Sequence, residues 1–290
     1  MRYAILLSYD GSPFCGWQVQ QGAETVQECL EQALSTLTGA PVSVTGAGRT
    51  DSGVNAVGYV AHFDVPDAGE ADAGGAGMRG APDPAVLSYK LNAIMPPSVV
   101  VHALWPVGAD LHDRFDASQR QYTYFLHRLK DPFVEKYSLR RDWDLDFEAM
   151  NRAAALLLGR HDFACFEKTG TDVKTTVCTV TEAFWAPYTP THVALMGFAP
   201  AAPAPGADPA SWRYMYFKIS ADRFLRNMVR AVVGTLLEVG RGKRSIEDFA
   251  ALILPVTAEP AVSPDPKLRS RAGDSVPGHA LFLSGVDYPL

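Results

Sequence analysis

The sequence lacks the cysteine and histidine patterns of metal-binding and disulfide-rich proteins. It has only four cysteines in 290 residues, and no two of them form a Cys-x-x-Cys pair. Its seven histidines form no His-Glu-x-x-His motif. Structural zinc sites and disulfide frameworks depend on such spacings. We therefore expect no metal site and no disulfide.

Long hydrophobic runs are also missing. The N-terminal apolar run, residues 1–7, soon meets Tyr9-Asp10-Gly11 and is too short for a signal peptide. A later apolar stretch, residues 228–239, contains Arg230 and Glu238 and falls short of the roughly 20 residues of a membrane span. These features predict a cytoplasmic protein without a membrane segment.

The composition is that of a folded protein with a sizeable core. Hydrophobic residues make up 47% of the chain, and its length fits one large domain or two smaller ones. The net charge of −6 argues mildly against nucleic-acid binding. However, residues 213–244 contain eight basic residues and only two acidic ones, so the local field differs from the average.

Hydrophobic periodicity predicts a β-α-β-β order at the N-terminus. Strands are expected at residues 2–9, 42–47 and 57–64, with a helix at 24–37. This order is half of a ferredoxin-like unit, which many RNA-binding sheets share. A helix at 85–94 and strands at 99–105 and 120–127 follow.

The C-terminal part continues with mixed elements. Helices are predicted at residues 146–158, 224–239 and 245–254, and strands at 174–184, 192–198, 212–220 and 281–287. Three segments rich in Gly, Ala or Pro read as connections, at 66–85, 199–211 and 260–277. The expected fold class is α+β. Two ferredoxin-like halves, residues 1–110 and 111–290, would form one continuous, mostly antiparallel sheet flanked by helices.

The run Gly-Ala-Gly-Arg-Thr-Asp-Ser-Gly at 46–53 contains the candidate catalytic residue, Asp51. It is not a dinucleotide-binding loop, because Asp51 stands where the third glycine is needed and a strand follows. It is not a phosphate loop, because Gly-Lys-Ser/Thr is absent. A tight turn with a capping aspartate is the ordinary interpretation. Arg49, two residues away, favours a functional one: paired with Asp51, it would keep a partly desolvated carboxylate ionised.

Residues 48–56, Gly-Arg-Thr-Asp-Ser-Gly-Val-Asn-Ala, resemble the Gly-Arg-Thr-Asp-Ala-Gly-Val-His-Ala signature of the TruA-type tRNA pseudouridine synthases. Other segments resemble the family in the same order along the chain. They are residues 9–18, 26–28, 114–124, 227–240 and 278–288. Ser52 and Asn55 depart from the commoner Ala and His.

The resemblance implies an isomerase, an intramolecular transferase that turns uridine into pseudouridine without a cofactor. Its substrates would be uridines 38, 39 and 40 in the anticodon stem-loop of tRNA, and the enzyme would be a homodimer. Asp51 would be the catalytic carboxylate. Arg49 would fill the gap left by the flipped base or hold a phosphate.

The resemblance also gives roles to two residues of the C-terminal half. Tyr122 would lie against the flipped base, although alternation with Tyr124 and Leu126 on a strand is equally typical of a core aromatic. Arg230 would pair with Asp51, whereas a basic residue in a helix can also be a snorkelling surface side chain. We expect the guanidinium of Arg230 within about 4 Å of the Asp51 carboxylate.

Two other function classes are compatible with parts of the sequence. A non-catalytic RNA-binding protein would use the basic stretch but not the Arg49/Asp51 pair. A carboxylate-dependent hydrolase would need a second carboxylate or a metal, and no second motif of that kind is evident.

Overall fold

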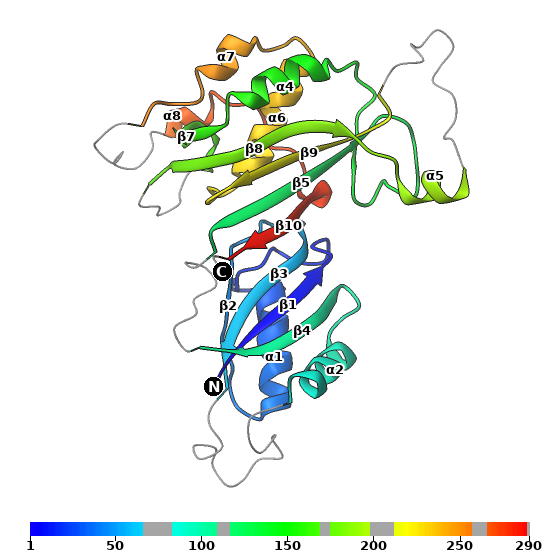
Figure 1. The fold of residues 1–290 in the computed structure, drawn as a ribbon, viewed down its shortest axis with the longest axis vertical. Helices are drawn as coiled ribbons and strands as arrows, with labels where there is room; N and C mark the ends of the chain where they lie inside the picture. Colours follow the sequence, from blue (N-terminus) through cyan, green and yellow to red (C-terminus); the bar gives the residue numbers. More distant parts are fainter. Residues whose placement is uncertain (66–82, 109–116, 169–174, 198–211, 257–265, 289–290) are drawn as a thin grey trace. The chain divides into compact units, whose positions relative to one another are not determined.

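The computed structural model describes residues 1–65, 83–108, 117–168, 175–197, 212–256 and 266–288. The chain forms two compact units (Figure 1). The first comprises residues 1–118 together with 282–290, and the second comprises residues 119–281. The final strand therefore belongs to the unit that the N-terminus begins.

The first unit contains β1 (Arg2–Tyr9), α1 (Val26–Thr38), β2 (Val44–Gly46), β3 (Asn55–Asp64), α2 (Pro84–Ile94), β4 (Val99–Val107) and β10 (Leu281–Asp287). The strands run in the order β4-β1-β3, and β2 pairs with β3. These pairs are antiparallel, whereas β10 joins β3 in parallel at Asn55 and Ala56. The βαββαβ order with this sheet is ferredoxin-like, which confirms the expectation for the N-terminal half.

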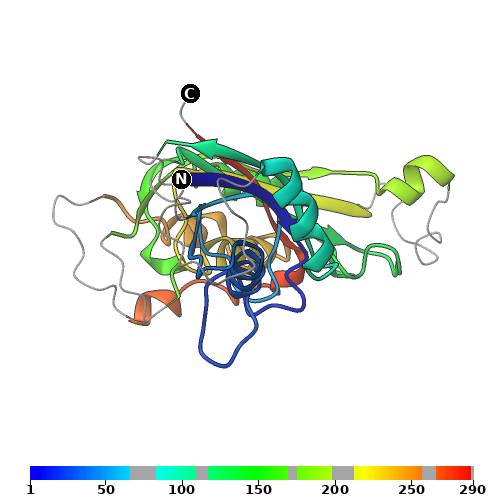
Figure 2. The same ribbon diagram turned by 90° about the horizontal axis from the view of Figure 1, so that it is seen from below.

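Local sequence explains why these elements form where they do. In β1, Tyr3, Ile5 and Leu7 are buried on one face of the sheet, and the ring of Tyr3 stacks on Phe63 at 5.7 Å between centroids. Helix α1 covers this sheet (Figure 2). It begins after Thr25, whose side chain accepts the Glu28 N–H, and ends at Gly39, which has a left-handed φ of 76°.

Strand β4 lies at the end of the strand order in this unit, and helix α2 lies beside it. The side-chain amide of Asn92, in α2, bonds both backbone groups of Val101, in β4. Asn92 Nδ2 donates to the Val101 carbonyl and Asn92 Oδ1 accepts the Val101 N–H, both at 2.8 Å. A side chain thus supplies the hydrogen bonds that a neighbouring strand would make.

The second unit begins with β5 (Gln119–His127), β6 (Leu139–Arg140), α4 (Phe147–Ala155), β7 (Gly159–Asp162), η1 (Ala164–Phe166), β8 (Val177–Pro187) and α5 (Thr191–Met196). It continues with β9 (Tyr214–Ala221), α6 (Met228–Gly240), α7 (Ile246–Ala250), α8 (Pro266–Arg269) and η2 (Gly278–Ala280). The strand order is β5-β9-β8-β7, antiparallel throughout, with β6 in parallel on β5. Both units are mixed helix and strand, so the α+β class is confirmed.

Two sequence predictions in this unit need correction. Residues 191–196 form helix α5 and not part of a strand, because Pro190 and Gly197 bracket a run too short and too unalternating to pair. The predicted helix at 224–239 begins only at Met228. Its N-cap, Asn227, has a left-handed φ of 64°, which separates Phe224 from the helix.

The remaining element predictions hold within a few residues, and β6, β7 and α8 were not predicted. The Gly/Ala/Pro-rich segments at 66–85 and 199–211 lie almost entirely outside the described residues, as does the first part of 260–277. Among the helices that the structure describes, none has the length and apolarity to cross a membrane.

Candidate active site

Asp51 lies in the loop between β2 and β3 of the first unit, and this loop is fixed by residues 14–17. The Trp17 N–H donates to the Thr50 carbonyl at 3.2 Å, and the Gly53 N–H donates to the Phe14 carbonyl at 3.3 Å. Within the loop, the Val54 N–H donates to the Asp51 carbonyl at 3.1 Å. Asp51 is therefore bracketed by backbone hydrogen bonds on both sides.

Two glycines allow this close approach. Gly16 has φ +89°, and a Cβ placed there would lie 2.5 Å from the Thr50 carbonyl oxygen. At Gly11, a Cβ would lie 2.1 Å from the carbonyl oxygen of Val54. Backbone atoms cannot give way as flexible side chains can, so both positions require glycine if the Asp51 loop is to keep its place.

Buried aromatic side chains support the same loop from the sheet. Trp17 stacks on Tyr59 with ring centroids 4.2 Å apart, and Tyr9 lies beside both rings. The Tyr59 hydroxyl donates to the Gly48 carbonyl, and the Tyr9 hydroxyl is 2.8 Å from Thr50 Oγ1. The residues on either side of Asp51 are thereby tied to the core.

Asn55, at the start of β3, also belongs to this framework. Its Oδ1 accepts the Gly11 N–H at 2.9 Å, and the residue is only 1% exposed. A buried backbone N–H without this acceptor would cost about 1–3 kcal/mol. The departure from the commoner histidine therefore keeps a hydrogen-bond acceptor at this position.

The two charged residues of the loop differ in exposure. Asp51 is half-buried, whereas Arg49 is exposed. The loop thus presents a partly desolvated carboxylate on a fixed backbone, with an exposed arginine two residues before it. This arrangement is suited to nucleophilic or general-base chemistry, because both require a positioned carboxylate.

Tyr122 and Arg230 lie in the second unit. Tyr122, in β5, is 9% exposed, and its ring meets the edge of Phe224 at right angles with centroids 5.1 Å apart. Phe224 precedes α6 in the segment that the sequence had assigned to the helix. Tyr122 is therefore packed against an aromatic ring, with a small part of its surface open.

Arg230 is half-buried on α6 and is held by the segment that leads to β10. Its Nε donates to the Val276 carbonyl at 2.7 Å, and the Val276 N–H donates to the Arg230 carbonyl at 3.2 Å. The next residue, Pro277, accepts the Tyr124 hydroxyl at 3.2 Å. Burial raises the pKa of Tyr124, although the charges of Arg141 and Arg230 act in the opposite direction.

The structure thus groups Arg49 with Asp51 in one unit, and Arg230 near the face of β5 from which Tyr122 and Tyr124 project in the other. The expected ion pair of Arg230 with Asp51 stays a prediction. Sequence reasoning gave no role to Gly11, Gly16 or Asn55. The glycines within residues 9–18 were a signal of these contacts in the sequence, because close approach of another backbone segment is a common reason for glycine.

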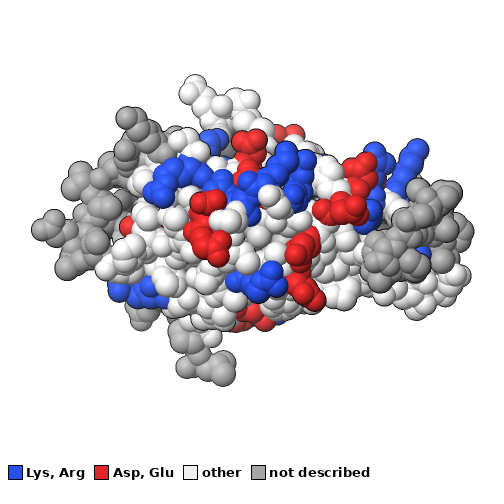
Figure 3. Space-filling view, turned by 90° about the horizontal axis from the view of Figure 1, so that it is seen from above, with Lys and Arg blue, Asp and Glu red and all other residues white. Residues whose placement is uncertain are grey.

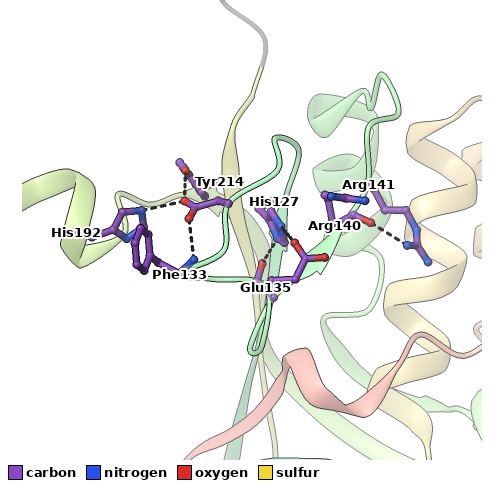
Figure 4. Close-up of polar contacts among 9 residues, drawn as sticks. His127, Phe133, Glu135, Arg140, Arg141, His192 and Tyr214 are labelled. Carbon is purple, nitrogen blue, oxygen red and sulfur yellow. Dashed lines mark hydrogen bonds and ion pairs between the residues drawn. The ribbon is translucent and has the colours of Figure 1, made fainter. Parts of the chain in front are cut away.

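A second polar cluster surrounds the buried Asp131, outside the predicted site (Figure 4). Its carboxylate accepts the Tyr214 hydroxyl at 2.7 Å, the Phe133 N–H at 3.0 Å and His192 Nε2 at 2.9 Å. Burial acts to raise the pKa of Asp131, but these hydrogen bonds and the charge of His192 outweigh it, and the net pKa is lowered. His192 thereby anchors α5, which has no buried residue.

Within the described residues there is no group of three or more His, Cys, Asp or Glu side chains that could hold a metal ion. Of the cysteines, Cys165 and Cys178 are buried, and burial raises the pKa of Cys178 to about 12. That thiol is accordingly protonated and unreactive at neutral pH.

Comparison with known proteins decides the family. A family model described as tRNA pseudouridine synthase matches residues 5–116 and 153–289. The chain belongs to the tRNA pseudouridine synthase family. Residues 48–53, which hold Asp51, fall within the first matched range, and Arg230 falls within the second. Tyr122 lies between the two ranges.

Relatives in this family are similar over nearly their whole length. The tRNA pseudouridine synthase A of Porphyromonas gingivalis is 44% identical over 288 residues, covering 99% of this chain and 97% of the relative. That of Bacteroides thetaiotaomicron is 42% identical and covers 99% and 91%. The Bacillus licheniformis enzyme of the same name is 37% identical and covers 99% of both chains.

Proposed function

We propose that the protein is an isomerase that converts uridine to pseudouridine in tRNA, with Asp51 as its catalytic carboxylate. The observation that carries the proposal is the fixed Asp51 loop in a chain that matches tRNA pseudouridine synthases almost from end to end. The substrate uridines are those at positions 38, 39 and 40 of the anticodon stem-loop.

The chemistry needs no redox partner. The bond between ribose C1′ and uracil N1 breaks, the base turns, and a new bond forms between C1′ and uracil C5. The proton on C5 leaves and N1 gains one, so atoms and electrons balance within the nucleotide. Accordingly, the proposal includes no cofactor.

Each site residue has a separate task. Residues 1–110 supply Asp51, which attacks or deprotonates the flipped nucleoside, and Arg49, which replaces the flipped base or holds a phosphate. Residues 111–290 supply Tyr122, which lies against the uracil ring, and Arg230, which keeps Asp51 ionised. Flipping the base costs a few kcal/mol, and these contacts offset it.

The protein is further proposed to act in the cytoplasm and as a homodimer. A tRNA substrate is available in that compartment. Relatives that are named tRNA pseudouridine synthase A match this chain over nearly their whole length. Light scattering of the purified protein distinguishes a dimer of twice 31.4 kDa from the monomer.

The decisive experiment mixes the protein with unmodified tRNA transcript and no cofactor, and measures pseudouridine. Asp51→Asn keeps the size and hydrogen bonding of the side chain but removes its charge. Pseudouridine formation is expected to fall by about 10³-fold or more, while tRNA affinity changes far less.

Two outcomes would contradict the proposal. A variant that retains a tenth of the wild-type rate would remove Asp51 from its catalytic role. A wild-type protein that binds tRNA tightly and forms no pseudouridine would instead be a non-catalytic RNA-binding protein, the alternative that the basic stretch leaves open.

A further inference from the structure

One cation cluster of the second unit lies outside the residues assigned above. Arg141 follows β6, and Arg241 follows α6. The guanidinium carbon of each lies against the indole of Trp143, at 5.0 Å and 3.8 Å from the ring centroid respectively. Two segments that are a hundred residues apart in the chain thus bring their positive charges to one aromatic ring.

The backbone holds both cations in place. The Arg141 N–H donates to the His127 carbonyl at 2.9 Å, and its Nη1 donates to the Arg140 carbonyl at 2.8 Å (Figure 4). The Arg241 N–H donates to the Leu237 carbonyl at 3.2 Å. Residues 242 and 243 continue the turn, in which Gly242 has φ +67°.

Arg241 and Lys243 present their charge to solvent, whereas Arg141 is half-buried. In the part of the chain that the structure describes, none of Arg141, Arg241 and Lys243 has an ion pair with a carboxylate. Two carboxylates close to them in sequence, Asp144 and Glu238, are paired with other arginines. Asp144 pairs with Arg128 at 2.6 Å, and Glu238 pairs with Arg244 at 2.8 Å.

We propose that Arg141, Trp143 and Arg241, with Lys243 beside them, form a binding site for RNA phosphates. A guanidinium that rests on an aromatic face has its plane fixed while its N–H groups stay free for an anion. Such a stack costs less side-chain entropy on binding a phosphate than a free arginine does. The site rests on the proposed function, since it contacts the same tRNA at a point outside the catalytic residues.

Basic side chains are also present on the surface of the molecule. On the face that is seen from above in Figure 1, Lys and Arg side chains form a band with acidic side chains between them (Figure 3). Such a mixed band steers a polyanion less strongly than an unbroken one, so preorganised contacts matter more. The ordinary structural role of Arg241, a cation at the C-terminus of α6, is compatible with the site but predicts no effect on RNA binding.

The test measures the affinity for unmodified tRNA transcript across a range of salt concentrations. Arg241→Gln is expected to weaken binding by roughly five- to tenfold near 0.1 M salt and to reduce the slope of log affinity against log salt by about one. Trp143→Leu should weaken binding with little change in slope, because the charges remain but lose their platform. Lys136→Gln is the matched control, since Lys136 lies over Tyr137 at 5.0 Å in another exposed cation–π pair.

Asp142→Asn adds a variant that loss of folding cannot mimic, because removing this exposed negative charge beside Trp143 should tighten tRNA binding. Equal slopes and affinities for Arg241→Gln and Lys136→Gln, with unchanged melting temperatures, would overturn the proposal. If the wild-type protein forms no pseudouridine, the proposed function fails, whereas the salt data still decide the phosphate site.

Discussion

At the scale of single residues, the position of Asp51 depends on close contacts between the backbone of its loop and the backbone of residues 11–17. Gly16 and Gly11 let residues 11–17 approach the loop more closely than any side chain would allow. Asn55 and Thr50 then complete the contact with side-chain hydrogen bonds. The carboxylate that we propose as the reacting group is therefore placed by residues that do not need to contact a substrate.

The first prediction concerns Gly16. Gly16→Ala adds a methyl group 2.5 Å from the Thr50 carbonyl oxygen and must displace the loop. Displacement of a reacting group by about 1 Å can lower a rate by about 10²-fold. We expect the kcat for pseudouridine formation to fall by at least tenfold.

Gly22→Ala is the control for this experiment. Gly22 also has a positive φ, of 73°, but nothing lies within 4 Å of its added Cβ. Both variants carry the same kind of backbone strain, about 1–3 kcal/mol, and only Gly16→Ala carries the clash. Equal kcat values for the two variants would contradict the role assigned to Gly16.

At the scale of elements, α6 and the segment before β10 pack closely against each other around Arg230. Gly234 allows the Asp274 carbonyl to approach, since a Cβ there would lie 1.8 Å from that oxygen. The Gly273 N–H donates to Thr235 Oγ1 at 3.0 Å, and Val276 exchanges hydrogen bonds with Arg230. The guanidinium is thus oriented by a hydrogen bond at Nε.

Arg230→Ala should lower pseudouridine formation by about 10²-fold or more, because the proposed cation beside Asp51 is lost. Arg230→Lys should restore part of it, since lysine keeps the charge but has neither Nε nor the planar fork. Equal rates for Arg230→Ala and wild type would leave the ionisation of Asp51 to Arg49. Melting temperatures of both variants separate this loss from unfolding.

The Asp131 cluster predicts how the stability of the second unit responds to acid. The folded-state pKa of Asp131 is lowered, so its contribution is present above the unfolded pKa of about 3.9 and is lost as the pH falls through the folded value. Asp131→Asn should reduce the free energy of unfolding by about 1–3 kcal/mol at pH 7. The difference from wild type should shrink below about pH 4.

Asp144→Asn is the comparison for this measurement. The Asp144 side chain is 92% exposed in its pair with Arg128, and exposed pairs contribute only about 0–1 kcal/mol. Urea unfolding at several pH values tests both variants. A difference between Asp131→Asn and wild type that does not depend on pH would show that the hydrogen bonds matter and the charge does not.

Sequence reasoning succeeded where structure is decided locally. The strands at 2–9 and 281–287 were predicted to the residue, because both combine dense apolar residues with clear turn residues at their ends. It failed for α5, which has no buried residue and is held to the rest of the unit by the hydrogen bond from His192 to Asp131, 61 residues away. The Asp51 loop was found from its motif, but the side-chain hydrogen bonds that hold it, Tyr9 to Thr50 and Gly11 to Asn55, join residues 41 and 44 positions apart and could not be predicted from local sequence.

At the scale of the whole molecule, the charge count of residues 213–244 overstates their field. Lys218 pairs with Glu182 at 3.1 Å and Arg244 pairs with Glu238 at 2.8 Å, so two of the eight basic charges are partly neutralised. Lys243 is exposed and has no such pair among the described residues. If this stretch contacts tRNA as proposed, fewer cations contribute to binding than the sequence suggests.

This difference gives a prediction about salt. Affinity for tRNA should fall steeply with salt in spite of the net charge of −6. Removing Lys243 and Arg244 together should flatten the slope by about one, nearly all of it from Lys243. Arg244→Gln alone should change the slope little and lower the melting temperature instead, because it leaves Glu238 without its partner. A slope that is unaffected by the double change would mean that this turn does not meet the RNA.

The bond between Asn92 and Val101 has a consequence for the life of the protein in a crowded cell. The edge strand of a sheet has unpaired N–H and C=O groups with which a strand of another chain can pair, and such pairing can start aggregation. Here the Asn92 side-chain amide, on α2, bonds both the N–H and the carbonyl of Val101 near the start of β4, as a residue of a further strand would. An incoming strand would have to displace the Asn92 side chain before it could pair with the free edge of β4. One side chain thus gives this edge the protection that other proteins obtain from a lysine, a proline or a bulge.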